Sequence, residues 1–222
     1  MTVPTQFRKG DAAIASYDAF DIAAGTGFIT FFGGQTSSAI TGPLHHLSTI
    51  EFWSHALATR GSTTNSAAFE NVLNINFDVE FNRPLNIKGD AVINIPLRID
   101  NISNTNTSYG KTSAEIKILR ESGNTSFVAA GSGGIFTETG GVDTYFTDCI
   151  KMSIPDTVHI KAGETLRLNI LAYGLSGTSA ETIYEIGHDP KNRATASNTN
   201  ANWGSVPTIL QALIPVKIDL GG

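Results

Sequence analysis

Apolar and polar residues alternate along residues 73–81, and this alternation limits the chain's possible folds more than any other feature. The apolar positions are Leu73, Ile75, Phe77, Val79 and Phe81. Successive side chains of a β-strand point to opposite faces, so a period of two indicates a strand with one buried and one wet face. The segment is therefore predicted to belong to a sheet that packs on one side.

The same alternation recurs at 91–99, 166–172 and 210–220. Less regular strands are expected at 27–32, 48–59, 112–120, 127–130, 145–154, 158–161 and 181–186. Glycine-rich and polar turns are expected between them, including 88–90, 121–124, 131–134 and 161–164. No sustained helical stripe occurs, although 66–71 is compatible with one helical turn. Roughly ten strands without intervening helices predict an all-β fold, an antiparallel β-sandwich of the jelly-roll type.

The chain has 222 residues, which suits one sandwich domain at 25–222 preceded by an irregular N-terminal arm at 1–24. The arm carries apolar side chains without a regular period. It is therefore expected to bury them against a partner subunit or, alternatively, against its own sandwich. The interface candidates in the arm are Val3, Phe7, Ile14, Tyr17 and Phe20.

Composition excludes several partners. A net charge of −5 provides no basic field for a phosphate backbone, so no direct nucleic-acid contact is expected. The first 25 residues lack the apolar core of a signal peptide, and no run approaches the roughly 20 apolar residues that cross a bilayer. A soluble protein without a membrane contact is predicted. Cys149 is the single cysteine, which rules out a disulfide within the chain, and a half-buried strand position is expected for it.

Tests for chemistry find no catalytic, metal or cofactor site, so the chain is predicted not to be an enzyme. The sequence Gly110-Lys111-Thr112 ends like a phosphate-binding loop, but Thr105 stands where that loop needs glycine. No two histidines have a spacing that places both rings on one side of a strand or helix. Trp53 and Trp203 are expected to be core or interface anchors, with a sugar-stacking platform as the alternative.

The segment 186–193 is the most distinctive one, because it gathers an imidazole, a carboxylate and a guanidinium after a predicted strand. A small-ligand or interface loop is one interpretation. The other is a turn in which Asp189 bonds the local backbone. The interface candidates here are His188, Asp189 and Arg193.

The order of segments is an arm, amphipathic strands, the strand pair across 158–168, the 187–193 loop and a final amphipathic strand. This order resembles the jelly-roll structural proteins of tailed-phage virions, particularly capsid decoration or cement proteins. The resemblance implies a subunit made in the host cytoplasm and located in the virion. It also implies a homo-oligomer, most often a trimer, that contacts the major capsid protein or another virion protein.

Two other classes share this architecture. One is a carbohydrate- or receptor-binding module, such as a lectin-like sandwich or a fibre tip. The other is a jelly-roll enzyme, which needs acidic or imidazole groups converging in a pocket. No functional residue of the virion proteins is carried over, because no motif here defines one.

Overall fold

The computed structural model describes residues 15–16, 26–37, 44–101, 107–139, 143–176, 181–192, 203 and 207–217. All the interface candidates of the arm lie outside these residues, as does Arg193. Within the arm, the strand β1 at Ala15–Ser16 pairs with Phe28 and Ile29. In the described residues there is no helix that is long and apolar enough to span a membrane.

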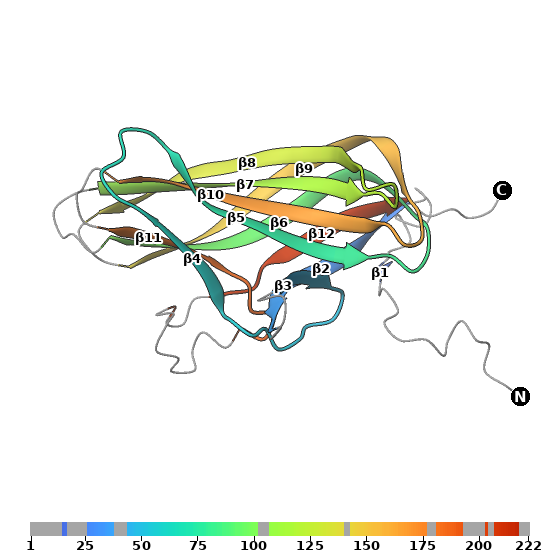
Figure 1. Cartoon of the computed structure of the whole chain (residues 1–222), viewed down its shortest axis with the longest axis horizontal. Coiled ribbons are helices and arrows are strands. Elements are labelled where there is room, and N and C mark those ends of the chain that lie inside the picture. The colour runs from blue at the N-terminus through green and yellow to red at the C-terminus, as the bar shows by residue number, and fades with distance from the viewer. Residues whose placement is uncertain are drawn as a thin grey trace, which may run out of the picture.

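The fold is all-β, as predicted. After β1 come β2 (Thr26–Thr36), β3 (Leu44–Ser48), β4 (Ala58–Thr63), β5 (Glu70–Glu80), β6 (Leu85–Asn101), β7 (Thr107–Leu119), β8 (Thr125–Thr139), β9 (Thr144–Ile160), β10 (Thr165–Ser176), β11 (Thr182–Gly187) and β12 (Gln211–Lys217). The strands run along the longest axis of the molecule (Figure 1). The predicted strands at 73–81, 91–99, 166–172 and 210–220 correspond to β5, β6, β10 and β12.

The strands form two layers of one continuous hydrogen-bonded sheet. One layer has the order β5-β10-β7-β8, and the other contains β9, β6, β12 and β2, with β11 and β4 extending it beside the end of β6. Strand β3 joins the layers, because it pairs with β2 on one side and with β5 on the other. The β3–β5 contact is a single parallel bridge between His46 and Asp78, and the other described pairings are antiparallel.

Three ladders nest about one turn, and this nesting produces the jelly roll. The turn at 121–124 joins β7 to β8, and Leu119 pairs with Thr125 across it. Further out along the same chain, Leu85 of β6 pairs with Ile160 of β9. The outermost ladder pairs β5 with β10. The chain from 70 to 176 is therefore one long hairpin that is folded over to form both layers.

The core is built from the inward positions of these ladders. The central residues Phe77, Ile93, Ile116 and Leu168 have no measurable exposure. They belong to a large apolar cluster that spans both layers, while Leu97, Ile99 and Tyr184 form a second cluster near β11. Each fully buried side chain of this size contributes roughly 1.5–3 kcal/mol. The alternation in the sequence thus identifies which residues of each strand face the core.

Four local predictions are wrong. Residues 49–57, expected as strand, connect β3 to β4 without being strand, and β5 begins where a helical turn was expected. Residues 88–90 lie inside β6, where Gly89 has a φ of 118° and the register with β9 shifts. The glycine therefore marks a β-bulge and not the end of the strand. Cys149, expected to be half-buried, is exposed on β9.

The expected turn at 131–134 is also wrong, because these residues lie within β8. A Cβ on Gly131 would lie 2.6 Å from Cγ2 of Ile150 and 3.1 Å from the backbone oxygen of Lys151. A Cβ on Gly133 would overlap the carboxylate of Asp148. These glycines are present because β8 closely approaches β9 in the opposite layer.

The approach of β8 to β9 is testable by substitution. Gly131→Val is expected to destabilise the fold by about 1–3 kcal/mol, because the added side chain enters the space of Ile150 and Met152. The matched control is Gly134→Val in the same strand, where a Cβ meets nothing within 4 Å. Chemical denaturation measures both. Equal stability of the two variants would contradict the close approach.

Candidate functional site

The predicted loop candidates His188 and Asp189 are fully buried. The His188 amide donates to Leu57 O at 2.9 Å, and the Asp189 amide donates to Thr208 O at 2.9 Å. Neither side chain is therefore exposed for a contact in the single chain. The two backbone hydrogen bonds hold this segment inside the protein. Neither these hydrogen bonds nor the burial can be recognised in the sequence.

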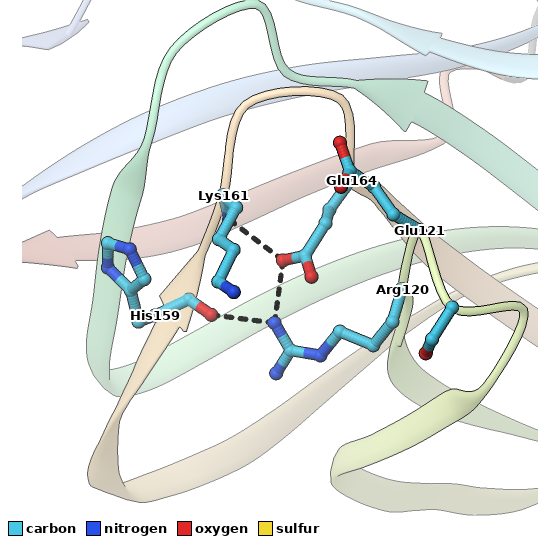
Figure 2. Close-up of a pocket in the computed structure, with 6 residues that line it drawn as sticks. Arg120, Glu121, His159, Lys161 and Glu164 are labelled. Atoms are coloured by element: carbon cyan, nitrogen blue, oxygen red, sulfur yellow. Dashed lines mark hydrogen bonds and ion pairs between the residues drawn. The ribbon is translucent and has the colours of Figure 1, made fainter.

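An open hollow lies where the long hairpin bends at one end of the sandwich (Figure 2). Its volume is about 510 Å³, and its lining includes Arg120 from the β7–β8 turn and Lys161 and Glu164 from the β9–β10 turn. The Arg120 guanidinium donates from Nη1 to Glu164 Oε2 at 2.6 Å and to His159 O at 2.8 Å. The Lys161 amide donates to the same Glu164 oxygen at 2.8 Å.

These contacts stabilise the corner. The Lys161 amide, and then Arg120, lower the pKa of the Glu164 carboxyl below its usual value. The neighbouring β5–β6 corner is tied to the same turn, because the Phe81 amide donates to Glu164 O and the Gly163 amide donates to Phe81 O. Two cationic and two acidic side chains line the hollow, so it offers no excess charge to a ligand. Its geometry explains how two bends of the roll are held together.

A buried ionic cluster lies at the other end of β6. The Arg98 guanidinium donates to Glu185 at 2.8 Å and to Asp100 and Asp143 at 2.9 Å. The Arg98 side chain is only 7% exposed, and that of Glu185 is 4% exposed. The hydroxyl of Tyr145 lies 3.3 Å from Asp143 Oδ2. One guanidinium thus bonds to three carboxylates, which come from β6, from β11 and from the residue that precedes β9.

Two carboxyl groups in this cluster interact with each other. Burial raises the pKa of Asp100 above its usual value, Arg98 opposes that rise and Asp143 adds to it. A raised pKa favours the protonated carboxyl as the pH falls. The cluster therefore places two carboxyl groups beside one buried guanidinium.

A second polar cluster lies where β3, β4 and the end of β11 meet. The Thr59 hydroxyl is 2.8 Å from Nε2 of His188 and 3.0 Å from Nε2 of His45. Nε2 of Gln35 is 3.2 Å from the same His45 nitrogen. The two imidazole rings are 5.1 Å apart, and the ring of Phe77 contacts both. We refer to His45, His188, Thr59 and Gln35 as the histidine cluster.

The histidine cluster favours neutral imidazoles. Burial, and then the neighbouring His46, lower the pKa of His45 below its usual value. Burial, and then His45, lower the pKa of His188 to about 3. Burial also lowers the pKa of His46. In the part of the chain that the structure describes, no group of three or more His, Cys, Asp or Glu residues is arranged to hold a metal ion.

Three of the six exposed large apolar side chains of the described residues lie along the segment from β3 towards β4. They are Leu44, Ile50 and Trp53, and we call them the 44–53 surface. Two contacts hold the segment: Ser48 Oγ accepts from the Ile50 amide at 3.1 Å, and Phe52 stacks on His46 with ring centroids 4.3 Å apart. Large apolar side chains held rigidly in water are typical of interaction sites.

The two tryptophans do not form a platform. Trp53 is 70% exposed, whereas Trp203 is fully buried and its ring centroid lies 5.6 Å from that of Tyr145. Trp203 is therefore a core residue, in agreement with the predicted anchor. The sugar-stacking alternative, as far as it required both rings, is wrong.

No protein-family model and no curated relative matches the chain. Among solved structures it is similar to a CocE/NonD family hydrolase from Staphylococcus aureus, with 15% identity and a TM-score of 0.46 over 86% of this chain. It is also similar to an aminopeptidase from a marine sediment Thaumarchaeota archaeon, with 8% identity and a TM-score of 0.48 over 85% of this chain. The chain spans only 37% of each of those proteins.

A structure of infectious bursal disease virus, Gx strain, also matches, with 11% identity and a TM-score of 0.24. That match covers 83% of this chain and 46% of the viral chain. At such identities and TM-scores, neither the viral nor the hydrolase likeness assigns an activity or a partner to this protein.

The prediction that the chain is not an enzyme is contradicted, because the matched solved structures include a hydrolase and an aminopeptidase. The prediction came from spacings along single strands. The ionic cluster shows why such spacings mislead, because Arg98, Asp143 and Glu185 are distant in sequence and adjacent in space.

The ionic cluster makes a measurable contribution to stability. Arg98→Met is expected to cost about 3–5 kcal/mol, because it leaves buried carboxylates without their cation. Arg60→Met is the control, since the Arg60–Glu181 pair is more than 40% exposed on both sides and is expected to change stability by less than about 1 kcal/mol. Urea denaturation at neutral pH compares them. A similar loss in both variants would contradict the role assigned to Arg98.

Proposed function

We propose that this protein is a virion structural subunit, a capsid decoration or cement protein that binds the major capsid protein through the 44–53 surface. The observation that supports the proposal is the exposure of Leu44, Ile50 and Trp53 on a segment whose backbone is fixed. The ordering of the strands, which resembles that of virion jelly-roll proteins, supports the same class.

The 44–53 surface has the chemistry of a protein contact. Tryptophan is enriched among the residues that dominate binding energy, and apolar side chains around it exclude water. Glu51, whose carboxylate lies 3.3 Å from Lys191 Nζ, places an ion pair at the edge of the apolar residues. An apolar centre with a charged rim is the usual arrangement of a protein–protein interface.

The subunit is proposed to act as a homo-oligomer, most simply a trimer, with the arm at 1–24 contributing to contacts between subunits. Several copies on a lattice would multiply a weak single contact. Light scattering of the purified protein measures the oligomeric state, and a monomer at micromolar concentration would contradict this part of the proposal.

Binding through the 44–53 surface is tested by substitution. Trp53→Ser is expected to weaken binding to capsids at least about tenfold, because an anchor of this size contributes roughly 2 kcal/mol or more. Phe127→Ser is the matched control, since Phe127 is 63% exposed on β8, away from the 44–53 surface. Co-sedimentation with capsids that lack the protein measures both variants.

The outcomes separate the proposed function from its alternative. Equal binding by Trp53→Ser and the unmodified protein would exclude the 44–53 surface as the capsid contact. Failure of the unmodified protein to bind capsids, combined with Trp53-dependent binding on a glycan array, would favour a carbohydrate-binding module instead.

A further inference from the structure

Strand β3 has an unusual place in the sheet, because the two layers are joined through it. It has five residues. All five pair with β2 on one side, and one of them, His46, pairs with β5 on the other side. Two of its five residues are His45 and His46. The strand that joins the layers therefore depends on side-chain contacts as much as on backbone hydrogen bonds.

The contacts of the histidine cluster suit two neutral imidazoles. Gln35 Nε2 is a donor, so Nε2 of His45 accepts from it and is unprotonated. The Thr59 hydroxyl lies between Nε2 of His45 and Nε2 of His188, and it can donate its single proton to only one of them. Nδ1 of His188 is fully buried and has no hydrogen-bond partner in another described residue.

A proton added to either ring breaks this arrangement. On His45 it would occupy the nitrogen that accepts from Gln35, so two N–H donors would face each other. On His188 it would place a charge in the core, where the cost of burial outweighs the hydrogen bond to the residue's own backbone. Both rings are 5.1 Å apart, so two charged rings would also repel each other.

The surrounding charges do not compensate such a proton. Besides His46 and His55, the ionic residues on the neighbouring strands and connections are Glu51, Arg60, Glu70, Asp78, Glu80, Glu185, Asp189 and Lys191. Five of these side chains, those of Glu51, Arg60, Asp78, Glu185 and Lys191, form ion pairs outside the cluster. Asp189 follows His188 and is fully buried, with its amide bonded to Thr208 O. The interactions that act on His188 most strongly are burial and the ring of His45, which both disfavour the charged form.

We propose that the histidine cluster is an acid-sensitive latch, in which protonation of His45 and His188 releases β3 and the attached 44–53 surface while the nested ladders stay closed. The latch depends on the cluster alone and not on what the 44–53 surface binds. Its chemical trigger is a fall in pH through the range in which an exposed imidazole becomes charged.

The direction of the pH effect follows from proton binding. An exposed histidine has a pKa of 6.5, while that of His188 in the closed state is about 3, so the released state binds more protons below pH 6.5. At about pH 4.5 this difference at His188 alone shifts the balance toward release by about 100-fold. The latch is therefore closed above pH 6.5 and weakens progressively as the pH falls.

Other parts of the fold respond differently in this range. The pKa of Glu164 at the corner is lowered, so its carboxylate stays charged. The pKa of Asp100 is raised, so the folded state holds a proton on this carboxyl more readily than an unfolded chain does, and acid does not destabilise the fold through this group. Mild acid is consequently expected to act on β3 before it acts on either end of the nested ladders.

Hydrogen–deuterium exchange of the full chain tests the latch at about pH 7.5 and about pH 4.5, with rates corrected for the intrinsic effect of pH. We expect the amides of β3 to lose at least about tenfold of their protection at the lower pH, while those of β7 and β10 keep theirs. The double variant His45→Gln/His188→Gln is expected to keep β3 protected, because neither side chain can be protonated. The control His159→Gln removes an exposed histidine on β9 and is expected to behave like the unmodified protein.

Two results would overturn the proposal. One is loss of protection in β3 only together with β7 and β10. The other is equal acid sensitivity in the double variant and the control. Should the double variant fail to fold, NMR titration of the histidine rings in the unmodified protein replaces it. The proposal requires that β3 is released over the same pH range in which His45 and His188 become protonated. Protonation of these rings while β3 stays protected from exchange would contradict the latch.

Discussion

The nested backbone ladders are the interaction on which the rest of the structure depends. Because β5 pairs with β10, β6 with β9 and β7 with β8, every inward side chain of one strand has a fixed neighbour on another. A slip of one residue would turn the apolar set of a strand toward water. The ladders thus convert a simple alternation in the sequence into one defined core, and they set where the polar clusters can form.

The polar clusters lie where the ladders change partner. Pro96 stands where β6 changes its neighbour from β12 to β11, and Arg98 collects its carboxylates just beyond that point. The histidine cluster lies where β3 connects the layers. Backbone pairing is interrupted at such junctions, so side chains supply the hydrogen bonds that the ladder no longer provides.

The sequence predicts the strands that have one wet face far better than it predicts the sites. Residues 73–81 identify β5 because burial of one face dictates each second residue. Gly131 and Gly133 misled the prediction, since glycine marks both turns and close approaches between strands. The partner that requires those glycines, β9, is known only from the fold.

The sites depend on contacts between distant residues, which periodicity does not reveal. His45 and His46 could be found in the sequence, but nothing there indicates that Thr59 and His188 come to meet His45. One signal was present and had no interpretation: Glu185 is an acidic residue within an otherwise apolar strand, and a buried charge of that kind requires a cation. Arg98 is that cation.

The nesting also defines an order in which the chain can close. Once the turn at 121–124 has formed, each pair of strands brings the next pair outward close together. The entropic cost of closing a long loop is therefore divided among several short closures. Strands β7 and β8 therefore form the natural nucleus, and β2, β3 and β12 join late. Substitutions in β7 or β8 should slow folding, whereas those in β2 or β12 should mainly speed unfolding, and rapid-mixing kinetics can distinguish the two. A jelly roll rich in long-range contacts thereby starts from its most local hairpin.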